Sequence, residues 1–140
     1  MVKESVSKIE VGKEIGVLQY RLTPWRLLKY VDTTGDDNRW YHVESPFGGV
    51  IAPPTIFDSD LMRLPDLRKM VDPHPRRLLA GQEYDFIKPA RPGKLITVRG
   101  KIADTYVKCS REYVVFEGLI SDEDGLELAR VRLIYCWPVE

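Results

Sequence analysis

The C-terminal part of the chain places the strongest constraint on the fold. From Gln82 onward, four β-rich runs follow one another, separated by short polar or Gly- and Pro-containing breaks. In the last run Val131, Leu133, Tyr135 and Trp137 alternate with Arg130, Arg132 and Ile134. A period of two is typical of a strand with one face on a core. The sequence therefore predicts an antiparallel meander with a buried face.

The run over residues 94–108 shows the same alternation. Ile96, Val98 and Ile102 lie on one expected face, and polar or charged side chains occupy the other. The first strand of the chain is expected earlier, over residues 15–22.

Two helices are predicted between that first strand and the β-rich half. Thr23 is expected to cap the first, with Pro24 at its first position and its end near Gly35. Thr55 is expected to cap the second, over residues 56–64, and the Pro- and Arg-rich residues 65–82 are expected to be irregular. The apolar stripe of the first helix is expected to contain Trp25, Leu27, Leu28, Tyr30 and Val31. This order of elements predicts an α+β domain with its helices on one face of the sheet.

Bulk properties limit the classes of function. The 140 residues are sufficient for one domain, and 21 basic residues balance 21 acidic ones. A formal charge of zero provides no global attraction for nucleic acid or an anionic membrane, and we expect neither as a partner. The opening residues lack the apolar core of a secretion signal, and the two cysteines form no disulfide framework. We therefore expect a cytoplasmic protein.

The stretch from Thr33 to Phe57, "TTGDDNRWYHVESPFGGVIAPPTIF", is the candidate functional segment. It combines two adjacent acids, an Asn, a His, a Gly pair and a Pro pair just before an apolar run. These residue types favour turns over regular helix or strand. We therefore expect an ordered loop that carries a function.

The order "GDDN…H", "GGVIAPPT", helix, "GQEYDFIKPARPG", "DTYVK…R" and "DEDG" resembles the MaoC-like dehydratases, also described as (R)-specific enoyl-CoA hydratases. It is most similar to the N-terminal type of module in fungal fatty-acid-synthase-like dehydratases and in two-subunit mycobacterial acyl dehydratases. The resemblance covers residues 15–137 and implies a single hot-dog domain over 1–140, in which an antiparallel sheet wraps a long central helix. It also implies a homodimer, or a heterodimer with another hot-dog chain.

The resemblance implies a lyase of fatty acid metabolism. Such enzymes reversibly hydrate a 2-enoyl thioester, carried on CoA or acyl carrier protein, to a 3-hydroxyacyl thioester. By this resemblance Asp36 or Asp37 would orient the water and His42 would assist it. The family implies no cofactor, and no cluster of metal ligands occurs in the sequence. The residues expected to contact substrate are Asn38, Gly48, Gly49, Pro53, Pro54, Thr55 and Tyr84.

The chemistry of hydration explains why such residues would be needed. Water attacks the β-carbon while negative charge develops on the thioester oxygen, so the site needs a base, an acid and a donor for the enolate. One carboxyl and one imidazole can serve as base and acid. The Gly48–Gly49 pair would let the backbone approach a ligand, and N–H groups after Thr55 would face the oxyanion.

The match departs from the family motif GD-x-N-P-x-H in its spacing. His42 follows Asp36 by six residues where the motif has five, and Arg39 stands in place of the Pro. The Pro53–Pro54 pair also replaces a His-Gly of many catalytic members, as it does in N-terminal-type modules that lack the catalytic pair. The alternative is therefore a non-catalytic subunit that binds the acyl chain and pairs with a catalytic chain.

Other features support weaker alternatives. A thioesterase on the same fold would need a carboxylate such as Glu44 or Asp58. His74 is expected to be a loop residue, and Cys109 and Cys136 are expected to be small packing residues in strands. A basic set could grip CoA phosphates or an acidic carrier protein, or could simply be solvated: Arg63, Arg68, Lys69, Arg76 and Arg77.

Overall fold

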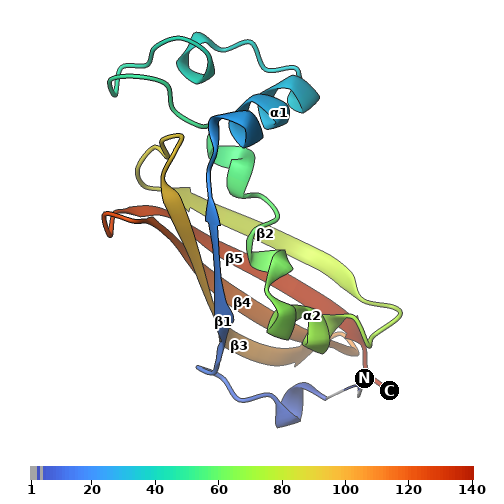
Figure 1. Ribbon diagram of the computed structural model, residues 1–140. Coiled ribbons are helices and arrows are strands. Elements are labelled where there is room, and N and C mark those ends of the chain that lie inside the picture. The colour runs from blue at the N-terminus through green and yellow to red at the C-terminus, as the bar shows by residue number, and fades with distance from the viewer. Residues whose placement is uncertain (1–2, 4) are drawn as a thin grey trace.

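The chain folds around one five-stranded antiparallel sheet, with the strands in the order β1-β3-β4-β5-β2 (Figure 1). The computed structural model describes residue 3 and residues 5–140. The strands are β1 (Glu14–Arg21), β2 (Leu78–Phe86), β3 (Leu95–Lys108), β4 (Arg111–Asp122) and β5 (Glu127–Pro138). Strands β3, β4 and β5 form the expected meander, whereas β2 pairs with β5 and becomes an edge strand. The predicted order of four consecutive neighbours is therefore wrong for β2.

The predicted alternation of buried and exposed side chains is confirmed. On β3 the side chains of Ile96, Val98 and Ile102 are fully buried, while Arg99 and Lys101 are exposed on the other face. On β5 the positions from Val131 to Trp137 alternate in the same way until the end of the strand, where Cys136 is buried as well.

Helix α1 (Pro24–Thr34) begins and ends as predicted. The Thr23 hydroxyl accepts a 3.1 Å hydrogen bond from the Arg26 N–H, and Gly35 closes the helix in the left-handed conformation at φ 67°. The predicted stripe is partly wrong, because Leu27 and Val31 are buried whereas Trp25 is 68% exposed and Leu28 50% exposed. The helix contacts the core through a narrow face, since it lies beyond the end of the sheet (Figure 1).

The single second helix predicted over residues 56–64 is wrong. The segment contains two 3-10 turns, η3 (Pro54–Phe57) and η4 (Leu61–Arg63), followed by α2 (Pro65–Val71). Thr55 lies inside η3 and is not its cap. Pro65 explains why η4 does not continue into α2, because a proline disfavours helical geometry at the preceding residue, and Leu64 is extended at φ −64° and ψ 124°.

The region expected to be irregular, residues 65–82, therefore contains α2 and the first half of β2. Pro65 starts α2 at the position where its missing N–H has no cost. Pro65, one of the prolines that suggested a loop, thus starts a helix.

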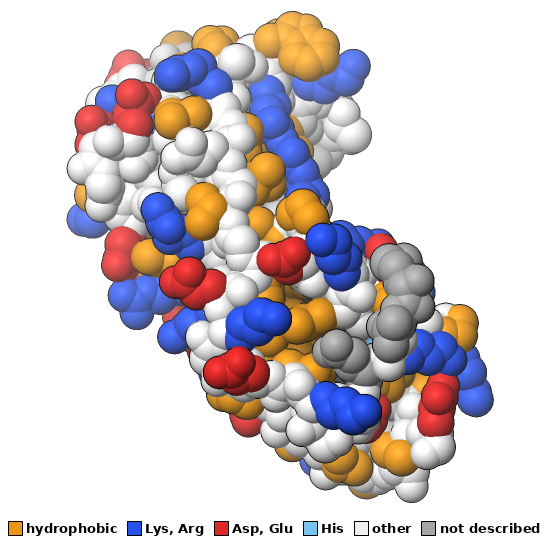
Figure 2. Space-filling view, turned by 60° about the horizontal axis from the view of Figure 1, so that its bottom comes forward, with side chains coloured by type: hydrophobic (Ala, Val, Ile, Leu, Met, Phe, Trp, Pro, Cys, Tyr) orange, Lys and Arg blue, Asp and Glu red, His pale blue; other side chains and the backbone are white. Residues whose placement is uncertain are grey.

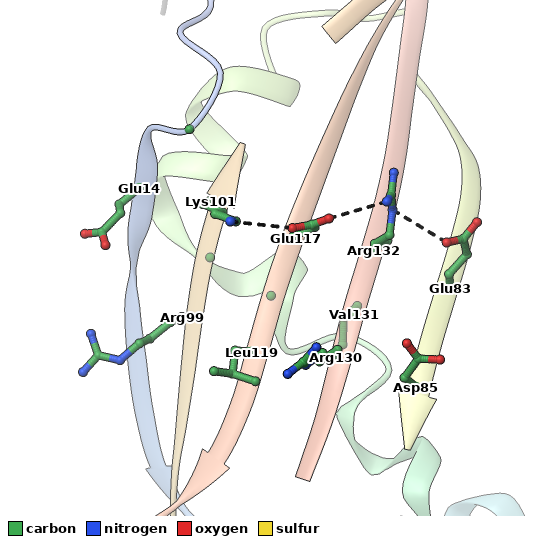
Figure 3. A pocket seen from close by; sticks show the side chains of 13 residues that line it. Glu14, Glu83, Asp85, Arg99, Lys101, Glu117, Leu119, Arg130, Val131 and Arg132 are labelled. Atoms are coloured by element: carbon green, nitrogen blue, oxygen red, sulfur yellow. Dashed lines mark ion pairs between the residues drawn. The ribbon is translucent and has the colours of Figure 1, made fainter. Parts of the chain in front are cut away.

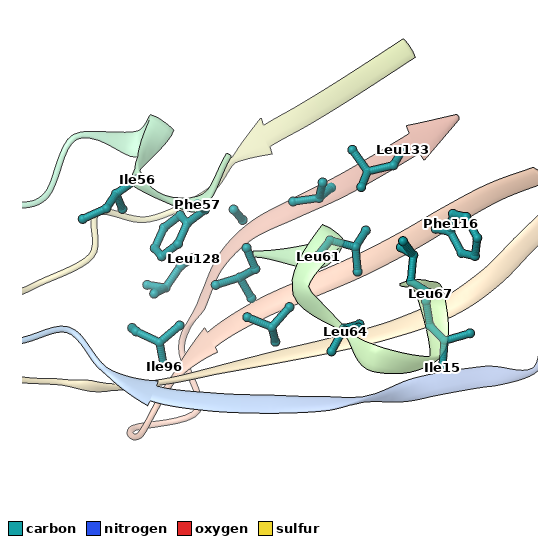
Figure 4. Packing of buried hydrophobic residues seen from close by; sticks show 14 of the residues in the cluster. Ile15, Ile56, Phe57, Leu61, Leu64, Leu67, Ile96, Phe116, Leu128 and Leu133 are labelled. Atoms are coloured by element: carbon teal, nitrogen blue, oxygen red, sulfur yellow. The ribbon is translucent and has the colours of Figure 1, made fainter. Parts of the chain in front are cut away.

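The broken helical segment packs directly on the inner face of the sheet (Figure 4). Leu61, Leu64 and Leu67 are almost fully buried there. Gly100 and Gly118 are cross-strand partners on β3 and β4, and they create the space for two of these leucines. A Cβ on Gly100 would lie 2.6 Å from the Leu64 side chain, and one on Gly118 would lie 2.9 Å from Leu61. Leu64 and Leu61 therefore pack directly against Gly100 and Gly118.

Two further 3-10 turns complete the described chain. Turn η1 (Val6–Lys8) lies at the end of the sheet near α2 (Figure 1), where Lys3 pairs with Glu140, and η2 (Arg39–Tyr41) lies in the loop after α1. Cys136 is buried as predicted, but Cys109 is exposed at φ 51° in the β3–β4 turn. No helix among the described residues is both long and apolar enough to cross a bilayer.

Candidate functional site

The loop after α1 is ordered by hydrogen bonds among its own polar side chains. The Asp36 carboxylate accepts a 3.0 Å hydrogen bond from the Asn38 N–H. The Asn38 side chain in turn accepts a 3.0 Å hydrogen bond from the Trp40 N–H and caps η2. Two of the predicted site residues thus shape the turn that leads to His42.

His42 lies close to Asp36, but it contacts the main chain of that residue. Its Nε2 atom is 2.9 Å from the Asp36 carbonyl oxygen. A carbonyl can only accept, so Nε2 carries the hydrogen and the ring braces the loop. Both His42 and Asp37 are exposed, and Asp36 is half-buried. The structure therefore brings Asp36 and His42 together and leaves Asp37 in solvent.

The Gly48–Gly49 pair forms a closed turn. Both glycines have positive φ values, 78° and 81°, which other residues rarely adopt. The Ser45 hydroxyl donates a 2.7 Å hydrogen bond to the Gly49 carbonyl, and the Glu44 carboxylate accepts from the Gly49 N–H. The sequence requires glycine here for the turn itself.

Arg91 holds this turn against the β2–β3 connection. Its guanidinium donates to the carbonyl oxygens of Phe47 and Gly48. The adjoining Ala52 N–H donates a 2.8 Å hydrogen bond to the Ala90 carbonyl. The sequence reasoning missed Arg91, because these contacts join residues more than forty positions apart.

Tyrosines tether the segment that follows Pro53 and Pro54. The Tyr30 hydroxyl, from α1, lies 2.9 Å from both the hydroxyl and the carbonyl oxygen of Thr55. The Tyr84 hydroxyl, from β2, donates a 2.6 Å hydrogen bond to the Asp58 carbonyl. Burial, reinforced by the nearby acids, raises the pKa of Tyr84. Of the predicted substrate contacts, Thr55 therefore lies on the tethered segment next to the buried Pro53, and Tyr84 holds that segment from β2.

A third tyrosine reaches the same segment from β1. The Tyr20 hydroxyl donates a 2.6 Å hydrogen bond to the Asp60 carboxylate, which is only 2% exposed. Burial raises the pKa of Asp60, and the hydrogen bond from Tyr20 opposes that rise. The Arg26 guanidinium stacks over the Tyr20 ring, 4.1 Å from its centroid. No pattern along the sequence linked Tyr20 to Asp60.

A polar groove of about 640 Å³ lies on the outer face of the sheet, opposite the helical segment (Figure 3). One cross-strand row in it alternates in charge over all five strands, because the paired positions are Glu14, Lys101, Glu117, Arg132 and Glu83. Glu117 lies 3.9 Å from the Lys101 ammonium and 3.5 Å from the Arg132 guanidinium. The groove is lined by equal numbers of acidic and basic side chains, so it has no excess charge to attract an anion.

The basic set between Arg63 and Arg77 is mostly paired with local acids. Arg68 and Arg77 lie 2.8 Å and 3.6 Å from the Asp72 carboxylate, and Lys69 lies 3.7 Å from Asp66. Figure 2 shows acidic and basic side chains interspersed over the face near the termini, with hydrophobic side chains in a hollow between them. Among the described residues, no group of three or more His, Cys, Asp or Glu side chains could hold a metal ion.

Comparison with known proteins gives a family match. Residues 10–131 match the model of the FAS1-like dehydratase domain region. No match was found among curated protein sequences.

Solved structures match over nearly the whole chain. One is a monoamine oxidase regulatory protein from Archaeoglobus (14% identity, TM-score 0.82, 99% of this chain and 96% of that one). Another is the MaoC-like dehydratase of Rhodospirillum rubrum (18% identity, TM-score 0.74, 98% of each chain). A third is the HadBC (3R-hydroxyacyl-ACP dehydratase) complex of Mycobacterium tuberculosis (15% identity, TM-score 0.73, 92% and 98%). At these identities the similarity shows the fold, and the predicted hot-dog fold is confirmed.

Proposed function

Because the chain belongs to the family of FAS1-like dehydratase domain regions, we propose that it serves in the reversible hydration of 2-enoyl thioesters, as the acyl-binding subunit of a two-chain enzyme. Its partner would be a second hot-dog chain that carries the reacting Asp and His. The substrate would be an enoyl thioester of CoA or acyl carrier protein.

The observation that carries this proposal is how Asp36 and His42 are used. The carboxylate accepts from the Asn38 N–H, and the imidazole donates from Nε2 to the Asp36 carbonyl oxygen. The Nε2 atom of His42 is thus used within the loop, and the ring contacts the main chain of Asp36 in place of its carboxylate. Here the ring and the carboxylate act as structural parts of the loop, which agrees with the longer spacing of the motif and with the Arg in place of its Pro.

The free edge of β2 supports pairing with another chain. An exposed edge strand presents unpaired backbone N–H and C=O groups, and proteins usually cover such edges. Strand β2 and the residues after it also expose large apolar side chains, namely Leu78, Leu79, Phe86 and Ile87. The HadBC structure, whose fold this chain shares, is itself a complex of two chains. We propose that β2 pairs with the equivalent strand of the partner.

The test is an ultraviolet assay of enoyl-CoA hydration, from crotonyl-CoA to longer chains. The purified chain alone is expected to be inactive. Adding a hot-dog chain that carries an unbroken GD-x-N-P-x-H motif is expected to give activity that exceeds that of the added chain alone. Equal activity with and without this chain would refute the subunit role.

A second candidate function is catalysis by the chain itself. The observation in its favour is that the structure places the His42 ring beside Asp36 even though they are six residues apart. In that case the purified chain would hydrate enoyl-CoA alone, and His42→Ala would lower the rate by about 10²-fold or more. An active chain whose rate is unchanged in His42→Ala would exclude this role for His42.

A further inference from the structure

A buried histidine lies beside the contacts that join the N-terminal turn to the last strand, far from the loop that carries Asp36. His74 is 6% exposed and lies between α2 and β2. Its ring stacks face to face on Trp137, with centroids 3.7 Å apart and the planes at 8°. The Nε2 atom of His74 is buried and has no hydrogen-bond partner among the described residues.

The stacked tryptophan continues into a hydrogen-bonded chain. The Trp137 indole N–H donates a 2.7 Å hydrogen bond to the buried Glu112 carboxylate on β4. The other oxygen of Glu112 accepts a 2.7 Å hydrogen bond from the Ser5 hydroxyl. Ser5 caps η1, whose Val6 side chain is buried in the core. The His74 ring thus covers Trp137, whose hydrogen bond to Glu112 leads on to Ser5 in the N-terminal turn.

Charged groups on four segments surround the His74 ring. Glu112 on β4 and Glu140 after β5 favour a protonated ring, while Lys3 near the N-terminus and Arg77 after α2 disfavour it. Burial is the largest influence, and it lowers the pKa of His74. Stacking on an indole would favour an imidazolium, but a second N–H at the buried Nε2 position would have no acceptor. The neutral ring therefore fits this place and the charged ring does not.

We propose that His74 is the pH-sensitive element of a latch, and that protonation of its ring unseats it from Trp137 and loosens the turn from Ser5 to Ile9. At neutral pH the stacked ring shields the Trp137–Glu112–Ser5 chain from water. Below the midpoint the ring moves to solvent, the indole is hydrated, and the hold on Ser5 weakens. This device does not depend on the proposed function.

Tryptophan fluorescence can test the latch, because the chain has three tryptophans and the other two, Trp25 and Trp40, are exposed. In a W25F/W40F protein, emission from Trp137 is expected to shift to longer wavelength on acidification from about pH 8 to about pH 5, with a midpoint below the usual 6.5 of imidazole. The variant His74→Phe, which keeps a stacking ring but cannot titrate, is expected to abolish the shift. A protein with His74 that shows no shift, or an equal shift with Phe at position 74, would overturn the latch.

Two further measurements keep the proposal testable if the Phe variant folds poorly. The NMR signals of the His74 ring report its protonation directly, and His42→Gln removes the only other histidine. Amide exchange reports the turn through the Lys8 and Ile9 N–H groups, which donate to Ser5 and Val6. Protection of these amides, corrected for intrinsic rates, is expected to fall as the ring protonates while the β3–β4 amides stay protected. Ring protonation with unchanged protection would refute the latch.

Discussion

The Tyr20 hydroxyl donates a 2.6 Å hydrogen bond to the buried carboxylate of Asp60 and so joins the first strand to the broken central helix. The residues are 40 positions apart, and Arg63 is a weaker second partner of the acid at 3.5 Å. The hydroxyls of Tyr30 and Tyr84 bind the same segment at Thr55 and Asp58. Together these bonds fix a segment whose helical pieces are each too short to be stable alone.

Tyr20→Phe is expected to lower the free energy of unfolding by about 1–3 kcal/mol. The change removes the donor and leaves a buried carboxylate oxygen without its short hydrogen bond. Urea unfolding followed by circular dichroism measures the effect. Tyr106→Phe is the matched control, because Tyr106 is exposed and is expected to change the free energy by less than about 0.5 kcal/mol. Equal effects of the two variants would contradict the role given to the Tyr20 hydroxyl.

Asp60→Asn is expected to change how stability depends on pH. The pKa of Asp60 is raised in the folded protein, chiefly by burial, so the native state binds more protons than the unfolded state above the ordinary value of 3.8. The contribution of this group is therefore present below 3.8 and is lost as pH rises through the raised pKa. In Asp60→Asn, whose amide oxygen can still accept from Tyr20, that loss is expected to disappear. Unfolding at a series of pH values checks this, with the exposed Asp37→Asn as control. An unchanged pH profile in Asp60→Asn would rule out the effect.

Patterns that are local in the sequence predicted most of the sheet and the ends of α1. The period of two on β3 and β5, and the Thr23 cap with its Pro24, each depend on residues a few positions apart. The stripe of α1 was only partly predictable, because Trp25 and Leu28 would be buried in a helix on the sheet but are exposed in one that extends past its end.

The candidate site was less predictable because its contacts are distant in sequence. Arg91 reaches the Gly48 turn from 43 residues away, and no period or motif links the two. The resemblance to the family motif predicted the proximity of Asp36 and His42 but not the orientation of the ring, which depends on one hydrogen bond to the backbone. The helix predicted over residues 56–64 ended before Pro65, but its apolar pattern favoured one helix where the structure has two 3-10 turns, and α2 after Pro65 was not predicted.

Gly100→Ala is expected to destabilise the protein by about 1–3 kcal/mol through overpacking. Its Cβ would lie 2.6 Å from the Leu64 side chain and 2.9 Å from that of Ile15. Leu64→Ala alone is expected to cost about 2–5 kcal/mol by leaving a cavity. Because the new methyl would occupy part of that cavity, the double variant is expected to lose less than the two single losses combined. Thermal or urea unfolding of the four proteins gives the coupling, and simple additivity would contradict the direct contact.

Glu117→Gln tests the row of alternating charges on the outer face. Glu117 contacts both Lys101 and Arg132, whereas Glu127, the control, contacts Arg130. Partly exposed pairs are weak, so Glu117→Gln is expected to cost up to about 1 kcal/mol at low salt and Glu127→Gln less. At about 1 M salt the Debye screening length falls to about 3 Å, and the difference in stability between the variants is expected to shrink. Urea unfolding at both salt concentrations checks this, and a difference that persists at high salt would mean that Glu117 acts through packing.

The two edge strands give a matched test of the proposed pairing. Leu79 on β2 and Val17 on β1 are both large, apolar and exposed, at 40% and 49%. If β2 pairs with a partner strand, Leu79→Asp places a charge in a surface that becomes dry, where an unpaired carboxylate is costly. We expect Leu79→Asp to lower the affinity for the partner chain by about 10-fold or more, since one buried charge costs more than 1.4 kcal/mol. Val17→Asp is expected to bind as the unchanged protein does, because β1 lies at the opposite edge. Light scattering and analytical ultracentrifugation of mixtures measure both, and weaker assembly of Val17→Asp with intact assembly of Leu79→Asp would place the interface on β1 instead.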